Sequence, residues 1–112
     1  MLDNKKKVLN LIGLATKAGK TVSGEFSTEK AVKSGKACMV LVSEDASDNT
    51  RKKFTDMCTY YRVPIMIFGD KDELGHYMGK EMRASLAVLD EGFAKAMVKQ
   101  MNINGGSKYE SQ

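Results

Sequence analysis

A segment rich in glycine and lysine, residues 17–36, carries the residue types that are best suited to hold an anion. Gly24 permits an unusual backbone angle and precedes a predicted helix, whose first backbone N–H groups point at whatever lies beyond the helix end. Lys30 follows within that helix, and Lys20 and Lys33 add positive charge nearby. This spacing favours phosphate binding, in an RNA or another polyanion. An ordinary loop followed by an exposed helix is the alternative interpretation.

The residue sets that usually support catalysis are missing from the sequence. His76 is the only histidine, and no sequence motif singles out a Ser or Cys as a nucleophile that it would activate. A catalytic pair of nucleophile and base is therefore disfavoured. The glycines do not form a dinucleotide fingerprint, and a phosphate loop that ends at Gly19 to Thr21 would need a glycine at Leu14. We therefore predict a protein without enzymatic activity and without a cofactor.

Acidic and thiol side chains are the remaining candidates for metal binding. Glu44 and Asp45 follow an apolar run, but two neighbouring carboxylates supply too few ligands, and negative charge is also favoured beside a helix N-terminus. Cys38 and Cys58 do not form a Cys-x-x-Cys pair, and we expect both to be reduced core residues. The sequence predicts no metal site.

Charge is distributed unevenly along the 112 residues. Residues 1–36 contain eight Lys and three acidic residues, whereas residues 37–112 contain ten basic and eleven acidic residues. The first third therefore attracts polyanions, although a solvated Lys-rich surface would look the same. No apolar run approaches the roughly 20 residues needed to cross a bilayer, and residues 1–7 lack the apolar core of a secretion signal. We expect a cytoplasmic monomer without membrane contact.

An α/β scaffold positions these residues. The unbroken apolar run Cys38–Val42 predicts a central strand that is covered on both faces. Apolar periodicity predicts helices at about 4–18, 26–34, 47–61, 70–79 and from 91 onward, and extended segments at 21–23, 38–42, 65–68 and 86–89. The alternation indicates a three-layer αβα sandwich with a sheet of about four strands. We predict one domain at residues 1–103 and a flexible tail at 104–112.

Polar residues mark where three of these helices begin. Ser47 and Asp90 are expected to cap the helices that follow them, and Asp70 with Glu73 has the spacing of a capping box. On the buried face of the third helix we expect Phe54, Cys58 and Tyr61.

Several motifs in order make the chain resemble a known family. They are Leu14-Ala-x-Lys-Ala-Gly-Lys, Gly24 with Lys30-Ala31, Gly35-Lys-Ala, Glu44-Asp-Ala-Ser, Val63-Pro64, and Leu74-Gly75 followed by Gly79-Lys80. Over residues 6–101 the chain is similar to the ribosomal protein L-seven-Ae and thirty-e family, and within it to the bacterial branch of small YlxQ-type proteins. The resemblance implies an αβα sandwich with a mixed sheet, which binds kink-turn RNA at tandem sheared G·A pairs.

The resemblance also implies which residues contact RNA. In the archaeal members a Gly-x-Asn-Glu-x-x-Lys segment reads the guanines, and the matching run here is residues 24–30. Gly24 and Lys30 are kept, but Phe26 and Ser27 stand where those members carry Asn and Glu. We therefore expect softer discrimination among bases, with Glu25 as a substitute reader from the neighbouring position.

Two further segments match RNA-contacting positions of the family. Lys71 corresponds to a phosphate-contacting lysine, and residues 80–83 correspond to a loop that packs against a flipped-out nucleotide. Lys80 and Arg83 are charged and leave Met82 as the apolar platform. We therefore expect weaker packing against the nucleotide and stronger contact with phosphates.

These observations predict a non-catalytic protein that recognises kink-turn or similarly bent RNA, in the ribosome or in another structured RNA. A second interpretation is a protein-docking domain with weak RNA binding, for which Phe26 and Met82 would form the exposed apolar patch. A flavodoxin-like ligand-binding domain or enzyme is a third.

Overall fold

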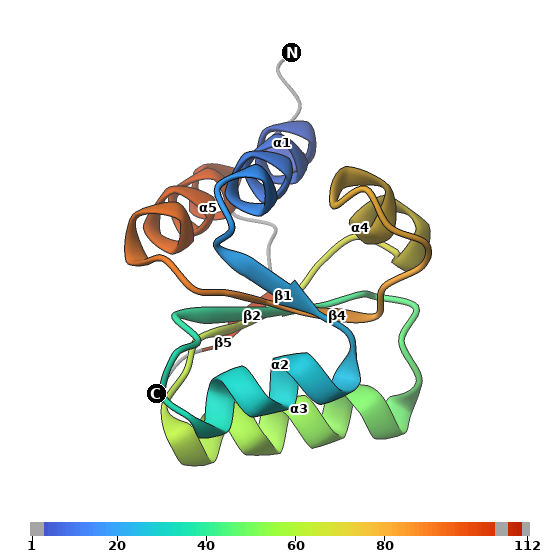
Figure 1. Cartoon of the computed structure of the whole chain (residues 1–112), viewed down its shortest axis with the longest axis vertical. Coiled ribbons are helices and arrows are strands. Elements are labelled where there is room, and N and C mark those ends of the chain that lie inside the picture. The colour runs from blue at the N-terminus through green and yellow to red at the C-terminus, as the bar shows by residue number, and fades with distance from the viewer. Residues whose placement is uncertain (1–3, 105–107, 111–112) are drawn as a thin grey trace.

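The computed structural model describes residues 4–104 and 108–110, which form an αβα sandwich (Figure 1). In chain order the elements are α1 (Asn4–Lys17), β1 (Thr21–Ser23), α2 (Glu25–Lys33), β2 (Met39–Val42), α3 (Asp48–Tyr61), β3 (Ile65–Ile67), α4 (Lys71–Tyr77), β4 (Ser85–Val88), α5 (Glu91–Asn104) and β5 (Lys108–Glu110). Helices α1, α4 and α5 cover one face of the sheet, and α2 and α3 cover the other. The predicted fold class is confirmed.

The strands form one mixed sheet in the order β1-β4-β2-β3-β5. Among the described strands, the β2–β3 pair is the parallel one, with Val40 opposite Ile65, and the other three pairs are antiparallel. β5 differs from the expectation, because the sequence predicts a flexible tail at 104–112, whereas Tyr109 lies opposite Met66 in the sheet. Residues 105–107 and 111–112 of that predicted tail lie outside the described residues.

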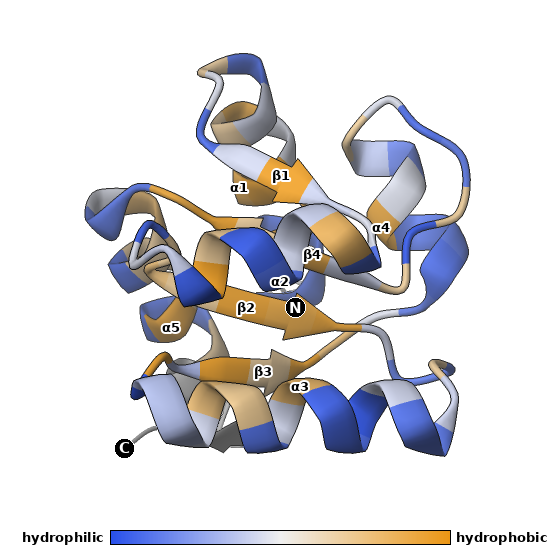
Figure 2. Ribbon diagram, turned by 60° about the horizontal axis from the view of Figure 1, so that its bottom comes forward, coloured by the Kyte–Doolittle hydropathy of each residue, from blue (hydrophilic) through white to orange (hydrophobic). Residues whose placement is uncertain are grey.

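Each face of the sheet has its own hydrophobic core, because successive strand residues point to opposite faces. Met39 and Leu41 of β2 join the core beneath α1, α4 and α5, whereas Val40 and Val42 join the core above α2 and α3. All four residues of β2 are buried, as the apolar run predicts. In Figure 2, β2 is hydrophobic along its length while α2 and α3 carry hydrophilic residues.

The three predicted caps are present. The Ser47 hydroxyl accepts a hydrogen bond from the Thr50 N–H at 3.1 Å, and the Asp90 carboxylate accepts one from Phe93. Asp70 and Glu73 form a reciprocal capping box at the start of α4. These bonds span three residues each, so local sequence suffices to specify them.

One buried-face prediction is wrong. Phe54 and Cys58 are fully buried in α3, but Tyr61 is 40% exposed and Met57 packs in the core instead. Tyr61 is the last residue of the helix, and Arg62 turns the chain away with a left-handed φ of 61°. Both cysteines are free thiols, and burial raises the pKa of Cys58 to about 12. Within the described residues, no helix has the length and apolar character needed to span a membrane.

Candidate nucleic-acid interface

The N-terminus of α2 has backbone N–H groups that no side chain of the described residues caps. Gly24 precedes it with φ 91°, a conformation that L side chains rarely adopt, and its N–H donates to the Ser85 carbonyl at 3.0 Å. The Thr28 N–H donates to the Gly24 carbonyl at 3.0 Å, which begins the helical hydrogen bonding. The N–H groups of residues 25–27 are therefore available to an anion.

A loop of residues 80–84 packs directly on α4. The Lys80 N–H donates to the Gly75 carbonyl at 2.8 Å, and the Arg83 N–H donates to the Lys71 carbonyl at 3.1 Å. A Cβ on Gly75 would lie 1.9 Å from the Glu81 carbonyl oxygen, so only glycine allows this approach. The backbone of the loop is thus held at a set position against the helix.

Arg83 joins this loop to the end of β1. Its Nε donates to the Ser23 hydroxyl at 3.0 Å, and its Nη1 donates to the Met82 carbonyl at 2.9 Å. The Gly24 N–H bond to Ser85, the residue that follows the loop and begins β4, holds the start of α2 beside the end of the loop. The loop of residues 80–84 and the open start of α2, sixty residues apart in the chain, therefore form one surface.

An ion-pair network runs along the α2–α3 boundary. Lys53 of α3 lies 2.7 Å from a Glu25 carboxylate oxygen and 2.8 Å from one of Glu29, and Lys33 lies 2.7 Å from Glu29. Hydrogen bonds from Lys33 and then Lys53 lower the pKa of Glu29 to about 2. The Glu29 carboxylate raises the pKa of Lys33 in return. Lys33 and Glu25, both predicted RNA contacts, are therefore already engaged within the protein.

Lys30 has a different environment. No carboxylate of the described residues lies within 4.0 Å of its ammonium group, and the side chain is exposed. It lies one turn after Phe26, which is 78% exposed, whereas Ser27 is half-buried. Phe26, Lys30 and Ser34 form a ridge with grooves of about 410 and 360 Å³ on its two sides. An exposed cation beside an exposed ring suits a phosphate and a base.

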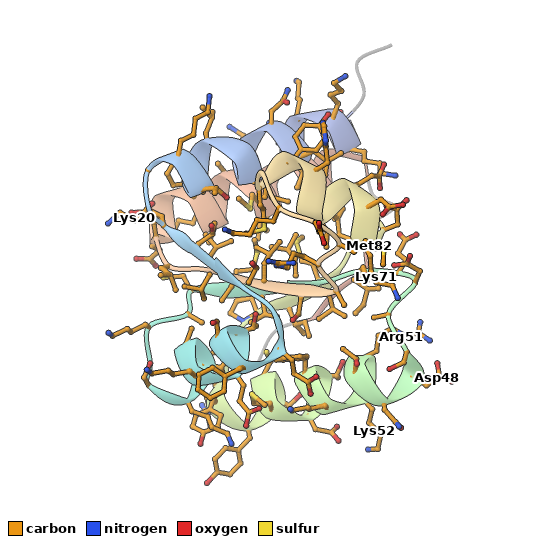
Figure 3. All side chains as sticks on the ribbon, turned by 45° about the vertical axis from the view of Figure 1, so that its right-hand side comes forward. Lys20, Asp48, Arg51, Lys52, Lys71 and Met82 are labelled. Carbon is orange, nitrogen blue, oxygen red and sulfur yellow. The ribbon has the colours of Figure 1, made fainter. Side chains whose placement is uncertain are left out.

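The predicted site residues divide into two groups. Lys71 opens α4 next to the loop of residues 80–84, and Met82 is 57% exposed on that loop. Lys20 precedes β1, whereas Gly24 follows it, so the strand separates them (Figure 3). The structure brings the residues at the start of α2 next to Lys71 and the loop, a set made up of Gly24, Glu25, Phe26, Ser27, Lys71, Lys80, Met82 and Arg83. Lys30 and Lys33 follow in the later turns of α2, and Lys20 lies at the opposite end of β1 from Gly24.

Sequence reasoning missed the partners that shape this surface. Ser23 and Lys53 have no local signal, because their contacts join different elements. Asp45 was expected to flank a helix N-terminus, and its carboxylate accepts the Lys71 N–H at 3.0 Å, so the helix is α4. Among residues 4–104 and 108–110, no group of three or more His, Cys, Asp or Glu is placed to hold a metal. His76 is exposed on α4, with its ring 5.4 Å from that of Tyr77.

Solved structures share this architecture. A protein of unknown function from Bacillus halodurans superposes with a TM-score of 0.83 at 35% identity, covering 86% of this chain and 97% of its own. The Giardia lamblia 15.5kD RNA binding protein superposes with a TM-score of 0.74, covering 89% and 87%, and at 19% identity this likeness concerns the fold alone.

Two curated relatives share a higher sequence identity with this chain than these two solved structures do. The RNA-binding protein YlxQ of Bacillus subtilis is 45% identical over 92 residues, which are 82% of this chain and 92% of that protein. The protein of the same name from Enterococcus faecium is 42% identical over 92 residues, 82% of this chain and 88% of its own. Residues 6–98 match the ribosomal protein L7Ae/L30e/S12e/Gadd45 family, and the chain belongs to that family.

Proposed function

We propose that this protein binds structured RNA with a sharp bend of the kink-turn type, through the start of α2 and the loop of residues 80–84. The observation that carries the proposal is the adjacency of the uncapped helix start at Gly24 and the loop anchored by Arg83. Backbone N–H groups and unpaired cations at one edge recognise phosphates irrespective of base. The name of the Bacillus subtilis relative, an RNA-binding protein, supports the same conclusion.

We expect phosphate contacts to supply most of the RNA-binding free energy. Lys30, Lys80 and Arg83 supply positive charge around the helix start. Each phosphate that a lysine or arginine neutralises releases counterions, so the logarithm of affinity should fall steeply and linearly with the logarithm of salt concentration. A flat salt dependence would contradict this arrangement.

The protein acts as a binding module in this proposal. It performs no catalysis and works in the cytoplasm as a monomer, on ribosomal RNA or another structured RNA, through a single αβα domain. Purified protein incubated with nucleotides or RNA should show no turnover. Turnover that disappears in a His76→Ala or Asp45→Ala variant would restore an enzymatic interpretation.

A titration of labelled RNA duplexes tests the proposal. One duplex contains an internal loop with tandem G·A pairs, and a matched duplex is fully Watson–Crick paired. We expect Lys30→Ala to weaken binding to the kinked duplex by about tenfold, the equivalent of one charge-assisted hydrogen bond. Lys99→Ala, which removes an exposed lysine from α5, should change affinity by about twofold or less. Equal losses, or equal affinity for both duplexes, would mean that the binding face lies elsewhere.

Protein docking is the second candidate, and the exposure of Phe26 and Met82 favours it. Two exposed apolar side chains on one side of a monomer suit a partner surface. Substitutions at Lys30 and Phe26 distinguish RNA binding from protein docking. If a partner stays bound to Lys30→Glu but is released by Phe26→Ala, docking is the function of this surface.

A further inference from the structure

Helix α1 carries positive charge that the interface at α2 does not use. Its sequence from Asn4 to Lys17 contains four lysines and no acidic residue. It covers the face of the sheet opposite to α2 (Figure 1). Lys5 pairs with Glu73 of α4 at 2.9 Å, while Lys6 and Lys17 are exposed on the outer side. A polyanion held at Gly24 therefore leaves these lysines on a different surface.

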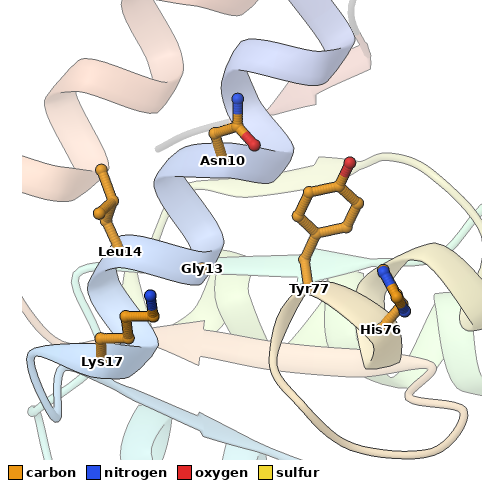
Figure 4. Close-up of a pocket in the computed structure, with 6 residues that line it drawn as sticks. All are labelled: Asn10, Gly13, Leu14, Lys17, His76 and Tyr77. Atoms are coloured by element: carbon orange, nitrogen blue, oxygen red, sulfur yellow. The ribbon is translucent and has the colours of Figure 1, made fainter.

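A groove of about 490 Å³ lies between α1 and the end of α4 (Figure 4). It is lined by Asn10, Gly13, Leu14, Lys17, His76 and Tyr77. Gly13 lies on α1 about one turn after Asn10, and a Cβ there would lie 3.2 Å from the Tyr77 carbonyl oxygen. Leu14 is 55% exposed at the edge of the groove.

We propose that the α1–α4 groove is a second RNA-contact site, which takes an unpaired nucleotide. The groove falls in the range of about 300 to 1,000 Å³ that is typical of small-ligand clefts. Tyr77 packs against the core and offers a braced ring for stacking. The exposed amide of Asn10 both donates and accepts, as a base edge requires, and Lys17 supplies a cation for the phosphate.

The charge on α1 favours RNA over an acidic peptide. Lys6, Asn10 and Lys17 recur at spacings of four and seven residues, so they share one face of the helix. Lys6 and Lys17 are eleven positions apart, which corresponds to about 16 Å along the axis. Lys17 lines the groove beside an aromatic ring and an amide, and Lys6 lies one turn before Asn10 on the same helix face, so the two cations match a strand whose phosphates repeat. A peptide would need no base-reading amide.

This inference goes beyond the proposed kinked-duplex site and does not depend on it. The groove shares no lining residue with the start of α2 or with the loop of residues 80–84. The test uses the full chain and a fluorescent single-stranded RNA octamer of mixed sequence. The Asn10→Ala/Lys17→Ala double variant should bind this octamer at least about tenfold more weakly, a loss typical of one base-edge hydrogen bond and one phosphate contact. Its affinity for the kinked duplex should change by about twofold or less.

Matched controls make the outcome decisive. Lys30→Ala should weaken binding to the kinked duplex and change octamer affinity little. Lys99→Ala should change the affinity for neither RNA. Amide chemical shifts should move at residues 10–17 and 76–77 when the octamer is added. Shifts confined to residues 24–30 and 80–84, or unchanged octamer binding by the double variant, would overturn the proposal. Equal competition by inorganic polyphosphate or by an acidic peptide would also overturn it, because nucleotide recognition requires more than charge.

Discussion

Replacing Gly75 by Ala tests how the loop of residues 80–84 is positioned. The new Cβ would lie 1.9 Å from the Glu81 carbonyl oxygen and 2.6 Å from its carbon, about 1.5 Å short of ordinary contact. Both obstructing atoms are backbone, so the loop must move rather than a side chain rotate. Overpacking of this kind costs about 1 to 3 kcal/mol, which outweighs the helix-propensity gain of up to about 1 kcal/mol.

The displacement should reach the RNA interface without touching any RNA-contacting side chain. Because Lys80, Met82 and Arg83 move with the loop, we expect Gly75→Ala to lose about tenfold in affinity for a kinked duplex, equivalent to about 1.4 kcal/mol. Urea unfolding should show a net loss of stability of up to about 2 kcal/mol, the overpacking cost less the propensity gain.

Gly92→Ala is the matched control for this substitution. Gly92 is exposed in the first turn of α5, and among the described residues its added Cβ would meet the Asp90 Oδ2 atom, at 3.1 Å. Because that oxygen accepts the cap hydrogen bond from Phe93, stability should fall by about 1 kcal/mol or less. RNA affinity should stay within about twofold, because α5 lies away from the RNA interface. If Gly75→Ala binds and unfolds like the parent protein, the loop is not held by its contact with α4 and the reasoning fails.

Three further predictions concern the outer face of α2. Lys30→Ala should reduce the slope of log affinity against log salt by about one, whereas Lys33→Ala should reduce it less, because Glu29 already pairs with Lys33; equal slopes in a salt titration would contradict this. Restoring Asn at Phe26 and Glu at Ser27 should sharpen the preference for G·A over Watson–Crick pairs by about tenfold or more, measured by competition at one salt concentration. A native preference of several hundred-fold would show that another residue reads the guanines. Because the folded-state pKa of Glu29 is lowered from 4.5 to about 2, its contribution to stability is present above pH 4.5 and is lost as the pH falls towards 2. An NMR titration of its carboxyl group should show the low midpoint, and in Lys53→Ala this midpoint should rise towards 4.5.

The ion pairs of α2 also refine the expected role of Glu25. The sequence offers Glu25 as a substitute reader of guanine, beside the changed positions Phe26 and Ser27. In the structure its carboxylate lies 2.7 Å from the Lys53 ammonium group. A base that recruited Glu25 would have to compete with this pair, which supports the expectation of softened base discrimination.

Local patterns in the sequence determined the elements of this protein. The apolar run that includes β2, the caps at Ser47 and Asp90, and the capping box at Asp70 depend on residues within three or four positions of one another. Such interactions follow from helix and strand geometry alone. For the same reason the alternation of elements was sufficient to predict the αβα sandwich.

Only the tertiary structure decided which of these elements form one surface. The Lys53–Glu25 pair spans 28 residues, the Asp45–Lys71 bond spans 26, and the Arg83–Ser23 bond spans 60. It also separated Lys20 and the lysines of α1 from Gly24, although all lie within the same basic third of the chain. The physical reason is that strand pairing and layer packing bring distant segments together, while a helix or strand of a few residues carries sequence neighbours to opposite ends or faces of the domain.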